Sequence, residues 1–173
     1  GEGIYLRFYQ WFSYSTCDFG YVQISVYDDL SETWSNWFQL GKKISRNSNV
    51  WSLRVDDISD YAGSTIRLCF LHTADASTWP NDCGASSHGW FIDKVTIEKK
   101  ELNFTGDFEM GIGDWEVSNG VWQIGSPVAG PSGSFEGRQS AGTVLDGYYP
   151  GNTDSRLISP PVTLPFTVGG EGI

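Results

Sequence analysis

Few residues in this 173-residue chain have the types and spacing that catalysis requires. The two histidines, His72 and His88, lack the spacing of paired metal ligands around a glutamate. His88 follows two serines, but neighbours in an extended chain point to opposite faces, and a catalytic triad also needs an orienting carboxylate. Glu109 and Asp93 are the pair of carboxylates that glycoside hydrolysis would use. Because no motif selects a reaction, we expect a protein that is not an enzyme.

The eight tryptophans suggest sugar binding, because flat aromatic rings stack on pyranose rings. Four of them lie in strand-like segments and are predicted to pack rather than bind: Trp11, Trp51, Trp90 and Trp115. Three lie in or near polar loops: Trp34, Trp37 and Trp79. A glycan site would use Trp79 with Asn81 and Asp82, or Trp34. The alternative role for these residues is surface packing or contact with a neighbouring domain.

The composition predicts an all-β globular protein. Apolar residues make up 39% of the chain and aromatic residues 15%, which excludes a disordered tail. Short Val, Ile and aromatic segments alternate with turn residues, including 21 glycines. The formal charge of −10 disfavours nucleic acids and anionic lipid surfaces as partners and favours cations. The sequence contains no apolar stretch long enough for insertion into a membrane.

Strand-like segments dominate the first half of the sequence. Six are predicted: residues 5–14, 21–28, 37–42, 51–56, 65–73 and 89–99. Val22, Ile24 and Val26 share one face of their segment, as expected for a half-buried strand. Residues 56–64 read as a tight connection with one helical turn, closed by Gly63. The second half offers three ordered pieces, residues 107–117, 120–125 and 155–164, and a loop over residues 127–137.

Two motifs flank the charged segment Lys99–Leu102, which we interpret as a connection between folded units. Before it, Gly89–Asp93 has the sequence Gly-Trp-Phe-Ile-Asp, and after it Phe108-Glu109 is followed by small residues and Trp115. These motifs resemble the end and the start of the jelly-roll β-sandwich modules called MAM-like or galactose-binding-like. Such modules are appended to secreted bacterial proteases, glycosidases and adhesins.

Further landmarks match the order of this family when the chain is followed from residue 103 to its end and then from residue 1 to residue 99. They are Asp154–Pro160, Tyr5–Trp11, Gly20–Ser25 and Asp60–Gly63. The resemblance therefore covers most of the chain, in a circularly permuted register. Two features depart from it: Lys94 stands where the family often has a second aspartate, and Asp28–Ser31 replaces a glycine-rich hairpin turn.

The resemblance also implies a metal site. In related modules the opening glutamate and the closing aspartate meet and hold a structural calcium ion together with backbone carbonyls. Glu109 and Asp93 are the corresponding residues here. Calcium prefers hard oxygen ligands, and the acidic chain offers three further candidates: Asp107, Asp146 and Asp154. The alternatives are that Asp93 caps a turn while Glu109 is solvated, and that Asp154 pairs with Arg156.

The three cysteines bear on the redox compartment. If the strands up to residue 73 run alternately up and down, the loops at 15–20 and 74–88 open at the same end of the sandwich. Cys17 and Cys83 lie in these loops, and a disulfide between them would indicate an oxidising compartment. Cys69, inside a strand, would then remain a small buried thiol. Three free cysteines in a reduced compartment are the alternative.

The sequence Gly-Glu-Gly-Ile occurs at residues 1–4 and again at residues 170–173, which predicts one period of a longer repeating protein. Residues 1–100 would then be the C-terminal part of one jelly-roll unit, and residues 101–173 the N-terminal part of the next. Either both halves fold together in one chain as a circular permutant, or a neighbouring copy completes each half. We favour the second arrangement, a head-to-tail assembly.

Together these features predict a non-catalytic β-sandwich repeat, extracellular or on a cell surface, that is stabilised by calcium. Its partners would be neighbouring copies of itself, and its role cohesion, spacing or adhesion. The alternative is a carbohydrate-binding module of a secreted hydrolase or protease, which would bind a polysaccharide through Trp79 or Trp34.

Overall fold

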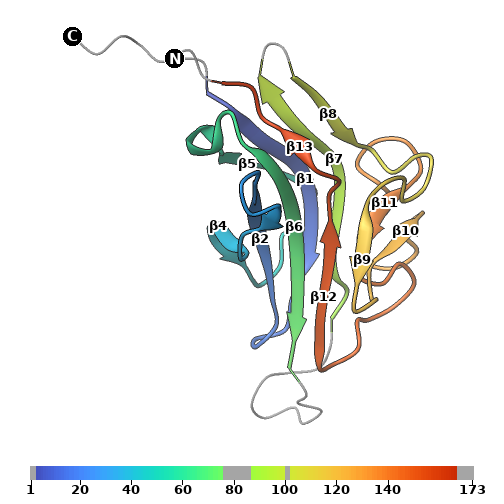
Figure 1. The fold of residues 1–173 in the computed structure, drawn as a ribbon. Helices are drawn as coiled ribbons and strands as arrows, with labels where there is room; N and C mark the ends of the chain where they lie inside the picture. The colour runs from blue at the N-terminus through green and yellow to red at the C-terminus, as the bar shows by residue number, and fades with distance from the viewer. Residues whose placement is uncertain (1–2, 76–86, 100–101, 167–173) are drawn as a thin grey trace.

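The computed structural model describes residues 3–75, 87–99 and 102–166 (Figure 1). Within these residues the chain forms two antiparallel sheets, of six and seven strands, which curl around a common core. A single 3-10 turn, η1 (Ser59–Tyr61), lies in the connection where a helical turn is predicted. The structure therefore confirms an all-β sandwich. No helix in the described part of the chain has the length and apolar character to cross a membrane.

The six-stranded sheet carries the candidate site on its outer face. Its strand order is β10 (Gln123–Gly125), β11 (Ser140–Gly142), β7 (Gly89–Lys99), β1 (Tyr5–Ser13) and β5 (Ser52–Asp57). Strand β8 (Leu102–Gly106) also pairs with β7, on the same side as β11. Strand β7 is thus the centre of this sheet.

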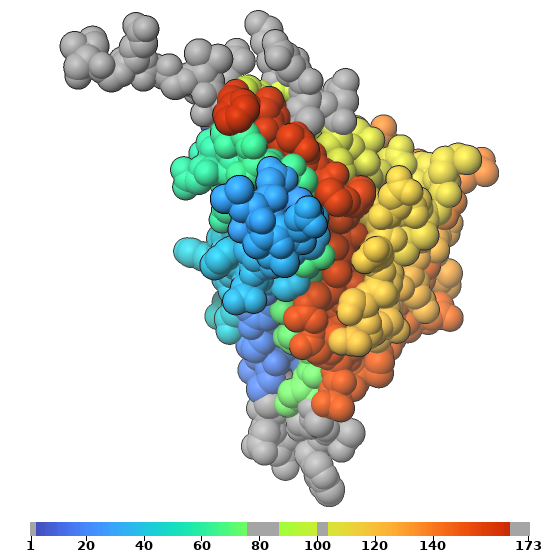
Figure 2. All heavy atoms as spheres, in the orientation of Figure 1, coloured from blue at the N-terminus to red at the C-terminus, as the bar shows by residue number. Residues whose placement is uncertain are grey.

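The seven-stranded sheet lies across the core from it. Its order is β3 (Thr33–Trp34), β2 (Phe19–Asp28), β6 (Thr65–Ala74), β12 (Thr153–Ile158) and β9 (Glu116–Ser118). Strand β4 (Phe38–Ile44) pairs with β2, and β13 (Val162–Thr163) pairs with β6. In Figure 2 the blue segment that contains β3 covers part of the outer face of this sheet.

The core follows the predicted alternation of apolar residues. Val22 and Ile24 of β2 are fully buried between the sheets, and Val26 packs against the edge of the core. The other strands contribute residues at the same period, among them Leu6, Phe8, Ile66, Leu68, Phe70, Trp90 and Ile92. Phe8, Phe70 and Trp90 contact one another edge-on or tilted, a favourable arrangement for aromatic rings.

Strands from both halves of the sequence share both sheets of the one chain. Strand β11 pairs with β7, and strands β12 and β13 pair with β6. The two described ends are held by one segment: the Ile58 N–H donates to the Ile4 carbonyl, and the Gly63 N–H donates to the Leu164 carbonyl. These pairings close the sandwich within a single chain.

Three short strands are absent from the sequence prediction: β3, β8 and β11. Residues Leu102–Gly106 form β8, a hairpin partner of β7, where the sequence suggested a connection between units. Residues Ser140–Gly142 form β11 although they have no apolar alternation, because their partner β7 supplies the pairing. Trp11 and Trp51 differ from their predicted packing role in that both are only half-buried.

Candidate functional site

A β-bulge in β7 sets the direction of the Asp93 side chain. Arg7 of β1 faces Thr96, whereas Tyr9 faces Asp93, so that one residue of β1 opposes two residues of β7. The bulged residue Lys94 has a φ of 49°, in the left-handed region that is costly for a side chain of this kind. Strained backbone of this kind often marks a functional position.

Asp93 is 1% exposed, and its carboxylate accepts three backbone hydrogen bonds. Oδ1 accepts from the Lys94 N–H at 2.7 Å, and Oδ2 accepts from the N–H groups of Phe135 at 3.0 Å and Glu136 at 3.2 Å. The pKa of Asp93 is raised to about 6, mainly because burial penalises the ionised form; the charge of Glu109 acts in the same direction, while the three donors oppose it.

Glu109 approaches the same region from the turn that follows β8. This turn is also strained, because Phe108 has a φ of 61°, and the Glu109 N–H donates to Asp107 Oδ1 at 3.1 Å. Oε1 of Glu109 accepts from the N–H groups of Arg138 at 2.9 Å and Gln139 at 2.8 Å. The Gln139 side chain in turn donates to the Glu109 carbonyl at 2.9 Å.

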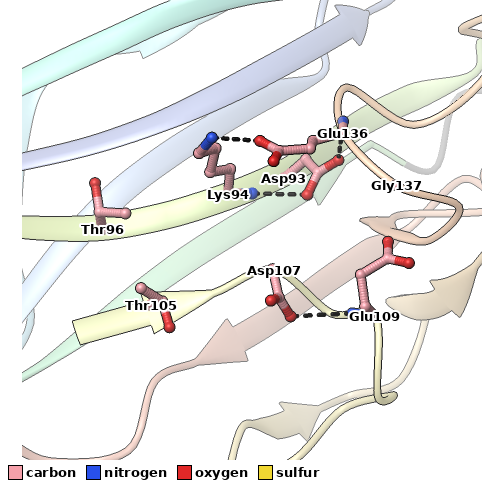
Figure 3. Close-up of a pocket in the computed structure, with 8 residues that line it drawn as sticks. All are labelled: Asp93, Lys94, Thr96, Thr105, Asp107, Glu109, Glu136 and Gly137. Atoms are coloured by element: carbon pink, nitrogen blue, oxygen red, sulfur yellow. Dashed lines mark hydrogen bonds and ion pairs between the residues drawn. The ribbon is translucent and has the colours of Figure 1, made fainter. Parts of the chain in front are cut away.

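Asp93 and Glu109 face one acidic pocket of about 280 Å³ (Figure 3). The pocket is lined by four carboxylates, two threonines, one lysine and one glycine: Asp93, Asp107, Glu109, Glu136, Thr96, Thr105, Lys94 and Gly137. Lys94, the one cation among them, forms an ion pair with Glu136. The other three carboxylates of the lining form no ion pair with a described residue. We call this hollow the acidic pocket.

The donor chemistry of the acidic pocket fits a hard cation such as calcium. Carboxylate and hydroxyl oxygens are the ligands this ion prefers, and it takes six to eight of them. Asp93 and Glu109 would be the first two protein ligands. Asp107, two residues before Glu109, also lines the pocket. No group of three His, Cys, Asp or Glu side chains within the described residues has metal-binding spacing. Backbone carbonyls and water would therefore have to supply the remaining oxygens.

Two other predicted ligands lie elsewhere. Asp146 is exposed in the segment between β11 and β12, and Asp154 is exposed on β12. Asp154 Oδ1 accepts from Arg156 Nη1 at 2.8 Å, the ion pair that the sequence offered as an alternative. Neither residue lines the acidic pocket.

The loop between β10 and β11, residues 126–139, forms the cover of the pocket and was predicted only as a loop. It folds back over the outer face of the six-stranded sheet, where the ring of Phe135 stacks on Tyr9. The Gly133 carbonyl accepts from Trp51 Nε1 at 3.0 Å. The only sequence signal is its glycine and serine content, which indicates a loop but does not reveal where it docks.

Of the predicted glycan residues, the described part of the chain contains only Trp34. Trp34 and Trp37 enclose Arg67, whose Cζ lies 4.5 Å and 4.6 Å from the two ring centroids. Tyr27 also contacts Trp34 edge-on. Trp79, Asn81 and Asp82 lie outside the described residues.

The cysteines behave differently from one another. Cys17 is disulfide-bonded, whereas Cys69 is a free, buried thiol whose pKa is raised to about 12, chiefly by burial. Cys83 lies outside the described residues, so the pairing of Cys17 with Cys83 stays a prediction. The Asp75 N–H, which directly follows β6, donates to Asp18 Oδ1 at 3.1 Å, next to Cys17 in the sequence.

The two histidines lie in different surroundings. The Ser87 hydroxyl pairs with the Ser13 hydroxyl, and Nδ1 of His88 lies 3.3 Å from the Gly147 carbonyl. His72 is fully buried, where Tyr14 and Tyr149 contact its ring. Desolvation lowers the pKa of His72 to about 4, which keeps the imidazole neutral.

Comparisons with protein-family models, with curated proteins and with solved structures find no match to the chain.

Proposed function

We propose that the chain is a non-catalytic structural module of extracellular or cell-surface material, of the MAM-like or galactose-binding-like jelly-roll type, in which calcium at the acidic pocket stabilises the sandwich. The observation that carries this proposal is the convergence of Asp93 and Glu109 on one pocket. The residues come from β7 and from the turn after β8, and both carboxylates hold the loop 126–139. A cation bound between the two carboxylates would connect strand β7, the turn after β8 and the loop 126–139.

The local charge supports a cation rather than an uncharged filler. The carboxylate of Glu109 contributes to the raised pKa of Asp93, which means that the two ionised groups repel each other. A divalent ion would relieve this repulsion. Its binding to the folded state alone would then stabilise the fold in proportion to the free ion concentration.

The disulfide at Cys17 supports a location outside the reducing cytosol, because structural disulfides persist mainly in oxidising compartments. The formal charge of −10 supports solubility and repulsion from nucleic acids. Both properties suit a secreted or surface-displayed module.

We also propose that neighbouring copies exchange halves, an arrangement that would keep the strand pairings of the single chain. Strands β12 and β13 bind β6, and strand β11 binds β7, through contacts that a second copy could make equally well. Residues 107–166 of one copy would then complete residues 3–106 of the next, because β8 stays paired with β7 of its own chain. The result would be a head-to-tail assembly that serves cohesion or spacing.

Carbohydrate binding remains the second candidate function, and one observation favours it. Two half-buried tryptophans, Trp11 and Trp51, line a hollow on the outer face of the six-stranded sheet. This hollow replaces Trp34 as the described site best suited to a sugar, since Trp34 is engaged by Arg67 and Tyr27.

Calorimetric scans of the whole chain with about 5 mM calcium and with excess chelator test the calcium proposal. Extracellular modules bind calcium with dissociation constants of about 10⁻⁴ to 10⁻³ M, so we expect calcium to raise Tm by roughly 3–6 °C. Glu109→Gln should remove this difference, whereas Asp154→Asn, which alters a carboxylate outside the pocket, should retain it. Superimposable scans of the unsubstituted protein would refute the proposal.

A further inference from the structure

The tryptophan-lined hollow is a second, chemically different depression on the sheet face that carries the acidic pocket. It has a volume of about 420 Å³ and is lined by residues from the end of β1, the approach to β5 and the loop 126–139: Trp11, Asn49, Val50, Trp51, Gly130, Pro131 and Ser132. Small-molecule sites typically have volumes of about 300–1,000 Å³. The hollow therefore has room for one or two sugar rings.

The aromatic walls of the hollow are fixed before any ligand arrives. Trp51 donates its Nε1 proton to the Gly133 carbonyl, and its ring contacts Phe135 edge-on. Trp11 contacts Phe91 and His88 edge-on, and Gly130 lies against its ring so closely that an added Cβ would be 3.1 Å from it. Side chains held in this way lose little conformational entropy on binding.

The residues that line the hollow indicate which chemical class of ligand it would bind. None of its residues carries a charge, although the chain as a whole is strongly acidic. Asn49 and Ser132 are exposed and provide an amide and a hydroxyl at the mouth, where 66% of the neighbouring Val50 side chain is also exposed. Flat indole rings beside uncharged hydrogen-bonding groups match the apolar faces and hydroxyl edges of a pyranose.

We propose that this hollow binds a pyranose unit of a neutral oligosaccharide, with Trp11 and Trp51 as the stacking surfaces. The loop that forms its third wall is the loop held by Asp93 and Glu109 at residues 135–139. Sugar binding should therefore weaken when the acidic pocket is disrupted. The sugar site rests on the second candidate function proposed above, and the coupling rests on the function proposed for the acidic pocket.

The test is a titration of the whole chain with cellohexaose, xylohexaose, mannohexaose, laminarihexaose and chitohexaose, followed by tryptophan fluorescence and calorimetry. We expect at least one of them to bind, and Trp51→Ala to weaken its binding about tenfold or more. Trp34→Ala, which removes a ring on the other sheet, should leave the affinity unchanged. Ser132→Arg should block the mouth from an exposed position without disturbing the core.

The outcomes separate this proposal from the calcium proposal. Binding that Trp51→Ala weakens about tenfold or more and that Ser132→Arg abolishes supports the site, whether or not chelator changes Tm; binding that Trp51→Ala leaves unchanged refutes it. If no neutral oligosaccharide binds, or if binding survives Ser132→Arg, the sugar site is refuted even when calcium stabilises the protein. Affinity unchanged by chelator, in a protein that calcium does stabilise, would refute only the coupling between the two hollows.

Discussion

Asp93 and Glu109 hold the same short stretch of loop from opposite sides of Gly137. Asp93 accepts the N–H groups of Phe135 and Glu136, and Glu109 accepts those of Arg138 and Gln139. Asp93 belongs to the first half of the chain, whereas Glu109 and the loop belong to the second half. Their carboxylates therefore connect both halves through a loop that neither half could position alone.

Gly137 is the residue in this arrangement that should tolerate substitution least. It has a φ of 66°, and a Cβ at this position would lie 2.4 Å from the Glu109 carboxyl carbon. Gly137→Ala should therefore lower the free energy of unfolding by roughly 1–3 kcal/mol and loosen the loop. Urea unfolding measures the change.

Substitutions at two other glycines distinguish the cost of backbone strain from the cost of contact with Glu109. Gly133 lies in the same loop, and a Cβ added there would meet open space, so Gly133→Ala should be nearly neutral. Gly113→Ala tests backbone strain alone, because Gly113 has a φ of 56° but no close neighbour. Equal effects at positions 113 and 137 would show that contact with Glu109 is unimportant.

His72 should make the fold sensitive to acid. Tyr14 and Tyr149 contact its ring, the Tyr14 hydroxyl lies 3.1 Å from Nδ1, and the Tyr149 hydroxyl donates to the Asp18 carboxylate. Its pKa is about 4 in the folded chain and about 6.5 in the unfolded chain, so the unfolded state binds more protons between these values. The contribution of His72 should be complete above pH 6.5 and fall by up to roughly 3 kcal/mol towards pH 4.

Unfolding free energies measured from pH 7 to pH 4 test this prediction. His72→Gln should flatten the acid limb of the profile, because it removes the proton uptake that accompanies unfolding. His88→Gln is the matched control, since it removes the other imidazole and leaves the buried cluster intact. An unchanged slope in the His72 variant would disprove the assignment.

The cysteines should differ in reactivity. Burial raises the pKa of Cys69 to about 12, so its thiol should resist alkylation in the native protein and react only after unfolding. Mass spectrometry of unreduced peptides should link Cys17 to Cys83. A peptide that joins Cys69 to either of the other cysteines would contradict both statements.

Arg67 should stabilise the segment that covers the outer face of the seven-stranded sheet. Its guanidinium lies between Trp34 and Trp37, and its Nε is buried without a hydrogen-bond partner among the described residues. Arg67→Ala should cost about 1–2 kcal/mol, and Arg67→Lys should recover only part of this, because an ammonium group cannot stack on two rings. Arg7→Ala, which removes an exposed ion pair with Glu98, should cost less than about 1 kcal/mol.

The sequence predicted those elements whose burial pattern is encoded locally. Strand β2 alternates Val22 and Ile24 with polar residues, so both its existence and its inward face could be predicted. Strand β11 consists of Ser140, Ala141 and Gly142, which have no periodic apolar signal. It forms a strand because its backbone groups pair with those of β7. This pairing depends on the tertiary structure and cannot be predicted from the local sequence.

Part of the candidate site could also be predicted from the sequence. Glu109 and Asp93 were identified through a resemblance, and the structure brings both to one pocket. The contribution of loop 126–139 could not be predicted, because it binds them through backbone N–H groups that any sequence possesses. The half-burial of Trp11 could not be predicted, because β1 has aromatic residues on both faces and the period alone does not show which face is covered.

The proposed exchange of halves can be tested at β6 and β13. Thr65 and Thr163 face each other across the two halves, with their hydroxyl oxygens 3.0 Å apart, so cysteines at these positions can form a disulfide. In the double variant the bond should close within or between chains. In a mixture of Thr65→Cys and Thr163→Cys single variants it can form only if the halves have exchanged between copies.

We expect crosslinked dimers on a non-reducing gel of the mixture after incubation at high concentration, and none from either single variant. A mixture that stays monomeric, while the double variant closes within one chain, would leave the permuted sandwich as the complete unit and eliminate the assembly.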